Sequence, residues 1–244
     1  MLHVLIPMCH KISLEPDSRD YPKILSEING KPMVQIIIES LKASLPKDAR
    51  FIFPVNHQDC ELYHLDRVLK LVAGEQSVIL PTQGETKGAA CSSLMAVGEI
   101  PSEDPLLILN SNQVIDANIS DILTDFRHQS CDAGVVCFQS VHPKWSFIKT
   151  ENDLVIEAAE KRPISNQAIA GFYYFKSAKL YFESAMNMIK KDVHWQGSYF
   201  NAPVLNELVL NHKKIITHEI DAKKYFNFSD EGVIKKYRQI LENR

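Results

Sequence analysis

Leu106-Leu-Ile-Leu-Asn-Ser-Asn-Gln-Val114 joins four apolar residues directly to a polar cluster. A short apolar run bounded by turn formers is typical of a buried central strand. In open α/β sheets, ligands bind just beyond the carboxyl ends of such strands. We therefore expect a site at residues 110–113. Asn112 stands there, in a position where a metal-dependent site would use a carboxylate.

The composition is that of an ordinary globular protein, with 244 residues, 45% hydrophobic and 23% charged, and a formal net charge of -3. This length suits one large α/β domain, and we predict a single domain over residues 1–244. The charge balance does not favour a nucleic-acid partner, and no apolar run is long enough for a membrane span. The five cysteines lack the spacing of a disulfide framework, so we expect a cytoplasmic protein with mostly buried cysteines.

The first half of the chain alternates strand-like and helix-like segments, which predicts a parallel sheet with helices on both faces. The second half is richer in strands and should add antiparallel pairs. The predicted strands cover 2–8, 51–55, 77–80, 106–109, 133–138, 145–149, 154–159, 169–175 and 214–220. The predicted helices are one that Pro32 opens and those at 59–73, 89–97, 118–127 (capped by Asn118 or Ser120), 177–190, 200–211 and 230–242. The expected fold is a three-layer α/β/α domain with a mixed, mostly parallel central sheet.

Four segments should meet at one rim of this sheet: the 9–23 loop, the 82–90 turn, residues 110–113 and residues 157–171. Lys23 follows Pro22 and is either a fixed cation over a polyphosphate or a solvated loop lysine. Gln83 carries both a donor and an acceptor for a base edge, and Gly88 permits close backbone approach, but a simple tight turn explains them equally. The run at 160–163 (EKRP) suits a sugar phosphate or, equally, a charged hairpin end.

Other candidate sites in the sequence are weaker. Cys60 and His64 are four residues apart on the predicted 59–73 helix and so share a face, but two ligands do not make a zinc site. Trp145 and Trp195 are better explained as core or pocket-wall residues than as a stacking platform.

Taken together, the segments resemble the sugar-phosphate nucleotidyltransferases, which join an NTP to a sugar 1-phosphate and release pyrophosphate. The resemblance covers nearly the whole chain, in order, and is strongest toward members from bacterial capsule and surface-glycan loci. Its motifs are Tyr21-Pro-Lys-Ile-Leu25 with Asn29-Gly-Lys-Pro-Met33, Gln83 with Gly88 and Ala90, Glu160-Lys-Arg-Pro163, and Ala170-Gly-Phe-Tyr-Tyr-Phe175.

The resemblance implies a Rossmann-like nucleotide-diphospho-sugar transferase fold, with a nucleotide-binding half at 1–130 and a sugar-binding half at 131–244. It implies Lys23 as the catalytic residue, an NTP and a phosphorylated sugar or similar small molecule as partners, and a homodimer as a possible assembly. The implied nucleotide-binding residues are Pro7, Met8, Lys11, Gln83, Lys87, Gly88 and Ala89. The implied substrate-binding residues are Gln113, Glu160, Lys161, Gly171 and Tyr173. Mg²⁺ is the implied cofactor, at the positions of Asn112 and Asn227.

Three features depart from the family pattern. The first loop lacks the glycines and the arginine that wrap a triphosphate, and Asn112 and Asn227 replace two metal-binding aspartates. Three interpretations stay open: an active nucleotidyltransferase with an altered phosphate site, a non-catalytic homologue that binds nucleotide or sugar phosphate, and a glycosyltransferase of related fold. The third is the weakest, because Asn110-Ser-Asn112 is a D-x-D motif with both acids replaced by amides.

Overall fold

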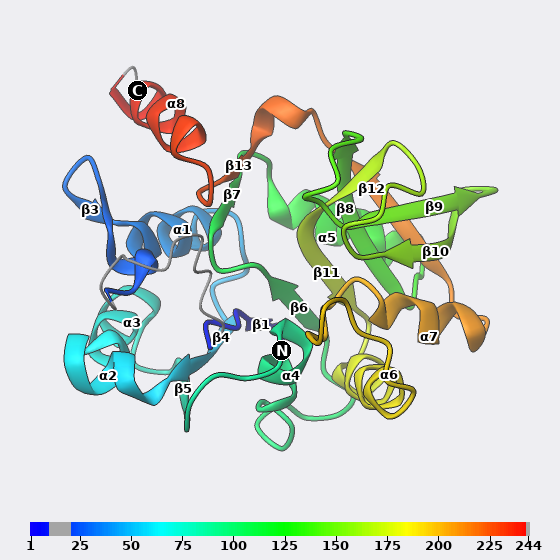
Figure 1. Ribbon diagram of the computed structural model, residues 1–244, viewed down its shortest axis with the longest axis horizontal. Helices are drawn as coiled ribbons and strands as arrows, with labels where there is room; N and C mark the ends of the chain where they lie inside the picture. The colour runs from blue at the N-terminus through cyan, green and yellow to red at the C-terminus, as the bar shows by residue number, and fades with distance from the viewer. Residues whose placement is uncertain (10–20, 243–244) are drawn as a thin grey trace.

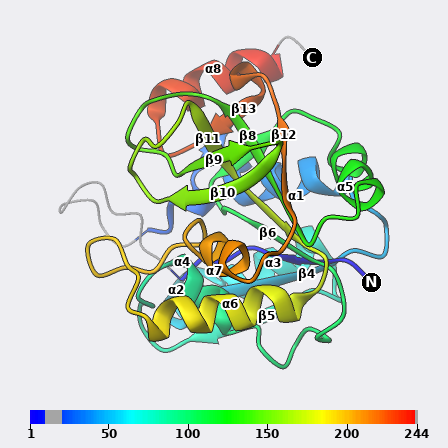
Figure 2. The ribbon, with the colours of Figure 1, turned by 90° about the vertical axis from the view of Figure 1, so that its right-hand side faces the viewer.

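A computed structural model of the chain describes residues 1–9 and 21–242. Within these residues, nine strands form one mixed sheet with the strand path β10-β9-β11-β6-β1-β4-β5, and β8 and β12 join it through β11. Helices cover both faces of the sheet (Figures 1 and 2). The predicted three-layer α/β/α architecture with a mixed sheet is therefore confirmed.

The first half of the chain builds the parallel part of the sheet. The pairs β1–β4, β1–β6 and β4–β5 all run parallel. Strands and helices alternate along this half, as the apolar pattern predicts. The elements are β1 (His3–Leu5), α1 (Met33–Lys42), β4 (Arg50–Asn56), α2 (His57–Tyr63), α3 (Leu65–Ala73), β5 (Val78–Thr82), α4 (Ala89–Leu94) and β6 (Leu106–Leu109).

Strand β6 lies in the middle of the sheet and is buried on both faces. Leu107 and Leu109 pack into the core that holds the apolar sides of α1 and α3. Leu106 and Ile108 point the other way, into a second core. This alternation follows from the two-residue period of a strand, and it explains why all four positions of β6 are apolar.

The second half adds the antiparallel strands. β11 pairs antiparallel with β6, β8 and β9, and the register of its pairing with β8 shifts between Ile169 and Tyr173. The elements are α5 (Ile119–His128), β8 (Ala133–Gln139), β9 (Phe147–Glu151), β10 (Leu154–Ala159), β11 (Gln167–Phe175), α6 (Ala178–Lys190), α7 (Val204–Leu210), β12 (Ile215–Glu219) and α8 (Glu231–Glu242).

A short ribbon beyond the end of β6 was not predicted from the sequence. β7 (Gln113–Ile115) pairs antiparallel with β13 (Tyr225–Asn227), so that Asn227 lies opposite Gln113. Figure 1 shows this ribbon between the two halves of the molecule. It brings the last part of the chain to the end of the central strand. The remaining short elements are η1 (Lys23–Leu25), β2 (Glu27–Ile28), β3 (Lys31–Pro32) and η2 (Ala222–Lys224).

The single helix predicted over 59–73 is wrong. Two helices occupy this region, because His64 adopts a left-handed backbone conformation (φ 54°) that ends α2 and precedes α3. Cys60 and His64 therefore do not share an unbroken helix face, and the weak case for a metal site there is lost. Other boundaries shift by a few residues: Pro32 precedes α1, and α4 ends at Leu94.

Helix α5 begins as predicted. The side chain of Asn118 accepts a hydrogen bond from the backbone N–H of Ser120, so Asn118 is the cap. All five cysteines are unpaired, and three of them are buried. Over residues 1–9 and 21–242, none of the helices combines the length and the apolar character that crossing a membrane requires.

Candidate functional site

The polar end of β6 is tied to β11 by backbone and amide hydrogen bonds. The backbone N–H of Asn110 donates to the carbonyl oxygen of Gly171 at 3.0 Å, and Nε2 of Gln113 donates to the same oxygen at 2.9 Å. The hydroxyl of Tyr225 donates to Oε1 of Gln113 at 2.9 Å. Gln113 is only 4% exposed, and both of its amide atoms are engaged, so its side chain links three strands.

Gly171 is the position that permits this close approach. Its φ is +57°, and a Cβ built there would lie 2.2 Å from Nδ2 of Asn110 and 2.4 Å from Oε1 of Gln113. A side chain at this position would require both the backbone and the neighbouring amides to move. The glycine therefore matches the bend in β11, and the resemblance had singled it out for the sugar pocket.

Asn112 and Asn227 lie together, as the resemblance implies. Nδ2 of Asn112 is 3.4 Å from Oδ1 of Asn227 and 2.5 Å from Oγ of Ser229. The backbone N–H of Ser229 also donates to Oδ1 of Asn227, at 2.9 Å. This backbone donor fixes which way the Asn227 amide points, because only its oxygen can accept the bond. We call these two asparagines the amide pair.

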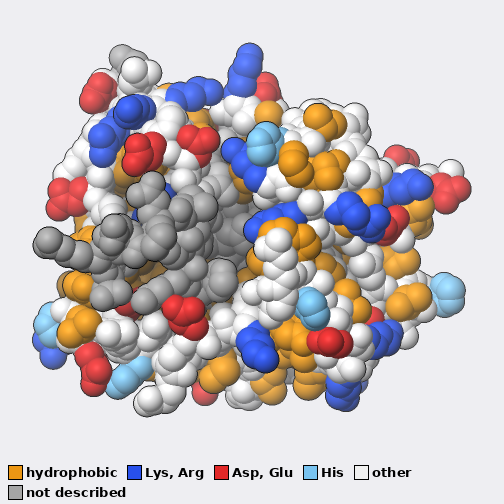
Figure 3. All heavy atoms as spheres, viewed as in Figure 1, with side chains coloured by type: hydrophobic (Ala, Val, Ile, Leu, Met, Phe, Trp, Pro, Cys, Tyr) orange, Lys and Arg blue, Asp and Glu red, His pale blue; other side chains and the backbone are white. Residues whose placement is uncertain are grey.

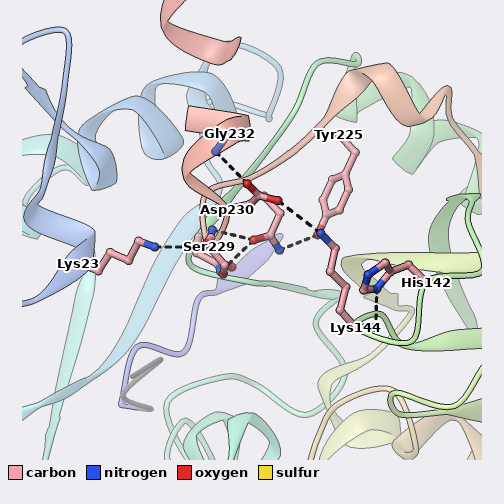
Figure 4. Close-up of polar contacts among 9 residues, drawn as sticks. Lys23, His142, Lys144, Tyr225, Ser229, Asp230 and Gly232 are labelled. Atoms are coloured by element: carbon pink, nitrogen blue, oxygen red, sulfur yellow. Dashed lines mark hydrogen bonds and ion pairs between the residues drawn. The ribbon is translucent and has the colours of Figure 1, made fainter. Parts of the chain in front are cut away.

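Lys23, from the other end of the chain, contacts Ser229 beside the amide pair. It lies in η1, and its Nζ donates to the carbonyl oxygen of Ser229 at 3.3 Å. Figure 4 shows its side chain extending toward the turn between β13 and α8. The structure thus brings the predicted catalytic lysine to Ser229, the residue that contacts both predicted metal positions.

A second lysine, which was not predicted from the sequence, approaches the same turn from the opposite side. Nζ of Lys144 lies 3.7 Å from Oδ2 of Asp230 (Figure 4). It also lies 4.7 Å from the ring centre of Trp145. Trp145 in turn packs edge-on against Tyr225, with ring centres 5.5 Å apart. An isolated lysine in the loop before β9 has no pattern that separates it from a solvated surface residue.

The sugar-site candidates form a second cluster. Oγ of Ser146 donates to Oε2 of Glu160 at 2.5 Å. Burial raises the pKa of Glu160, and the Ser146 hydrogen bond and the Lys161 charge only partly offset this effect. The hydroxyl of buried Tyr173 lies near Ser146 and Glu160, and burial together with the Glu160 charge raises its pKa well above 10. The structure therefore brings Tyr173 and Glu160 together.

Lys161 extends over aromatic rings. Its Nζ lies 4.2 Å from the ring centre of Trp195 and 5.4 Å from that of Phe200. An ammonium at this distance is attracted by the negative faces of the rings. Trp195 thus contacts the predicted phosphate-binding lysine, and its role as a pocket-wall residue stays a prediction.

The 82–90 turn lies against the segment that carries these rings. The backbone N–H of Tyr199 donates to the carbonyl oxygen of Lys87 at 2.8 Å, and a Cβ at Gly88 would lie 2.4 Å from the carbonyl oxygen of Tyr199. Position 88 therefore needs glycine because any Cβ there would collide with the backbone of Tyr199. Gln83 and Lys87 are exposed, Ala89 is half-buried, and Gly88 is buried.

The remaining nucleotide-binding candidates follow β1. Pro7 and Met8 are half-buried, and the backbone N–H of Met8 donates to the carbonyl oxygen of Pro54 at 2.7 Å. Both residues therefore lie at the carboxyl end of the parallel strands, where ligands bind in such sheets. Lys11 lies outside the described residues.

The residues at the predicted metal positions do not fit Mg²⁺. This ion prefers anionic oxygen ligands, whereas the amide pair is neutral, and Oδ1 of Asn227 already accepts two hydrogen bonds. Across residues 1–9 and 21–242, no three His, Cys, Asp or Glu side chains are grouped closely enough to hold a metal ion. The groups that the described residues offer at this position are amide and hydroxyl donors and two lysine ammonium groups.

Comparison with known proteins gives one family match. Residues 13–237 match the family model described as nucleotidyl transferase. The bifunctional protein GlmU of Caldicellulosiruptor saccharolyticus is 23% identical over 232 residues, which cover 89% of this chain and 46% of that protein. The chain thus spans about half the length of this curated relative.

Solved structures share the fold. A nucleoside-diphosphate-sugar pyrophosphorylase from Vibrio cholerae RC9 superposes with a TM-score of 0.79 at 20% identity, over 98% of this chain and 100% of that one. An inositol-1-phosphate CTP transferase from T. maritima gives 0.76 at 13% identity, over 99% and 94%. A UDP-glucose pyrophosphorylase in complex with UDP-glucose gives 0.74 at 16% identity, over 99% of each chain. At these identities the likeness establishes the fold.

Proposed function

Since the chain belongs to the nucleotidyl transferase family, we propose that it transfers a nucleotidyl group from an NTP to a sugar 1-phosphate or a similar phosphorylated small molecule. A phosphate oxygen of the acceptor forms a bond to the α-phosphorus of the NTP, and the bond from that phosphorus to the pyrophosphate leaving group breaks. The observation that carries this proposal is the hydrogen bond from Lys23 to Ser229, which contacts both residues of the amide pair beyond the end of β6, where a ligand of this fold is expected.

Each half of the chain takes one substrate in this proposal. Residues 1–130 bind the nucleotide, with Gln83 and the backbone at Gly88 facing the base. Residues 131–244 bind the acceptor, with Glu160 and Lys161 as its polar contacts. Lys23 neutralises charge that builds up around the α-phosphate during the attack, so catalysis rests on positioning and electrostatics.

We also propose a setting for this activity. The product would be a precursor of a surface glycan or capsule, an extension of the resemblance of the sequence motifs to transferases from such loci. The five unpaired cysteines support a reducing compartment such as the cytoplasm. A homodimer remains a prediction, and sedimentation analysis of the oligomeric state can test it.

A second candidate is a non-catalytic homologue that binds nucleotide or sugar phosphate. The amide pair favours it, because two neutral side chains stand where the family has metal-binding acids. The two candidates differ in turnover: both bind ligand, but only the first releases pyrophosphate.

The test is a pyrophosphate-release assay over the common NTPs paired with a panel of sugar 1-phosphates, run with Mg²⁺, with Mn²⁺ and with EDTA. The proposal predicts turnover with at least one pair and a loss of about 100-fold in kcat/KM for Lys23→Ala. Lys213→Ala, which removes an exposed lysine after α7, is the matched control and should match the wild type. Nucleotide binding without turnover across the panel would support the second candidate instead.

A further inference from the structure

The amide pair is arranged to donate hydrogen bonds. Oδ1 of Asn227 faces the turn and accepts from Ser229 and Asn112, so its Nδ2 points the other way, toward the hydroxyl of Tyr225 at 3.4 Å. Nδ2 of Asn112 donates to Oγ of Ser229 and to Oδ1 of Asn227, so a phosphate would have to replace one of these acceptors. Amide nitrogens and hydroxyls can donate to a phosphate oxygen, which the carboxylates of a metal site cannot do.

The charges around the pair also suit an anion. Lys23 and Lys144 carry two positive charges, and Asp230 carries one negative charge, which leaves a net charge of +1 (2 − 1) over these groups and the amide pair. Two aspartates at positions 112 and 227 would make the same set −1 (2 − 3). The replacement of the acids thus turns a site that needs a cation into one that attracts an anion.

Lys144 is placed to exchange partners. Its side chain is 44% exposed and lies 3.7 Å from Oδ2 of Asp230, whose side chain is 50% exposed, so solvent screens this pair and makes it weak. The Lys144 ammonium lies 4.7 Å from the ring centre of Trp145, which packs against Tyr225, the residue whose hydroxyl accepts from Asn227. A phosphate at the amide pair competes for the ammonium with the Asp230 carboxylate. Figure 3 shows Lys and Arg side chains along the boundary between the two halves on this face of the molecule.

We infer that this site binds a polyphosphate directly, through Lys23, Lys144 and the donors of the amide pair, without a divalent cation held by the protein. Lys144 is then a phosphate-binding residue that supplies part of the positive charge a bound metal would otherwise provide. The inference rests on the proposed function, since it names how the nucleotide phosphates or the released pyrophosphate are held. The ligand class is a diphosphate or triphosphate group.

The experiment is calorimetric titration of the full chain with inorganic pyrophosphate, in EDTA and separately in Mg²⁺. The wild type should bind pyrophosphate in EDTA. Lys144→Ala should weaken binding in EDTA by about five- to tenfold, as expected for loss of one charge-assisted contact at a partly exposed site, and Lys144→Arg should restore most of it. Lys213→Ala should bind like the wild type. Thermal melting of each variant checks that it is folded.

A converse variant tests the role of the amides. Asn112→Asp with Asn227→Asp should lose binding of pyrophosphate in EDTA and regain it with Mg²⁺, because the two acids need a cation between them and the anion. The inference is overturned if the wild type binds pyrophosphate only with Mg²⁺, or if Lys144→Ala binds as tightly as the wild type. These outcomes are independent of turnover. If the enzyme turns over but binds pyrophosphate only with Mg²⁺, this inference fails and the catalytic proposal stands. If the protein binds pyrophosphate in EDTA but shows no turnover, the catalytic proposal fails and this inference stands.

Discussion

Nδ2 of Asn112 lies 3.4 Å from Oδ1 of Asn227, although 115 residues separate the two in the chain. The pairing of β7 with β13 produces this contact, since it sets Asn227 opposite Gln113, next to Asn112. The backbone N–H of Ser229 holds the Asn227 oxygen in place. Two neutral amides can occupy this geometry without a counterion, whereas two carboxylates at this separation would repel each other.

The stability of the amide pair can be tested by replacing Asn227 alone, and then Asn112 and Asn227 together, with aspartate. Asn227→Asp alone should melt close to the wild type, because a carboxylate oxygen can still accept from Ser229. Asn112→Asp with Asn227→Asp should lose about 1–2 kcal/mol of unfolding free energy in EDTA, or roughly 2–8 °C in Tm, through repulsion of the two charges. Mg²⁺ should recover this loss. Thermal melts in both buffers measure it, and a double variant as stable as the wild type in EDTA would contradict the placement of the two side chains.

Gly171→Ala should destabilise the protein by about 3 kcal/mol or more. The new Cβ would lie 2.2 Å from Nδ2 of Asn110 and would also impose a left-handed backbone on alanine. Gly84→Ala is the matched control: Gly84 has φ +72° but no atom within 4 Å of the added Cβ, so only the backbone cost of about 1 kcal/mol applies. Chemical denaturation of the two variants gives the difference, and equal losses would count against the close approach at β11.

Trp195→Ala should leave the Lys161 ammonium less firmly positioned, because it removes the ring that the ammonium contacts. Loss of the ring 4.2 Å from Nζ removes a cation–π contact worth about 0.5–1 kcal/mol at a partly exposed site. If Lys161 binds the acceptor phosphate, KM for the sugar 1-phosphate should rise about two- to fivefold while kcat changes little. Trp195→Phe keeps an aromatic face and should fall in between. A change in kcat alone would assign Trp195 to another role.

Glu160 should make the stability of the fold depend on pH in a defined direction. Burial raises its pKa above the ordinary value of 4.5, so the folded state binds a proton more tightly than the unfolded chain does. This contribution to stability is present below the unfolded pKa and is lost as the pH rises through the folded pKa. Glu160→Gln removes the cost of ionising the buried group, so its stability relative to the wild type should increase as the pH rises above 4.5.

A control separates this effect from a general change in charge. Glu157 is partly exposed and pairs with Arg162 at 2.8 Å. Glu157→Gln should show no such gain over the same pH range, since little burial acts on its carboxyl group. Parallel denaturation curves across pH for both variants provide the comparison.

Much of the fold was predictable from local patterns. The all-apolar run at 106–109 is buried on both faces, and Asn118 caps the helix that follows. The break at His64 was not predictable, because histidine is only a weak signal for a left-handed conformation and the apolar spacing continues across it. The ribbon of β7 and β13 was missed because three-residue strands are too short to show a two-residue period.

The site was predictable only in part. The resemblance singled out Asn112 and Asn227, and the structure brings them together. Lys144, Ser146 and Ser229 were missed, because each reaches its neighbours through a tertiary contact between segments that are distant in sequence. Gly88 was predicted only as a turn residue. The structure shows why a glycine is needed there: the backbone of Tyr199 packs against it and leaves no room for a Cβ.

The most direct test of direct phosphate binding is a crystal structure of the protein with a non-hydrolysable NTP analogue and Mn²⁺, with the anomalous signal of manganese recorded. The account predicts phosphate oxygens in contact with Lys23, Lys144 and the amide pair, and no manganese coordinated by Asn112 or Asn227. A manganese peak within coordination distance of the two asparagine oxygens, about 2.2 Å, would contradict it.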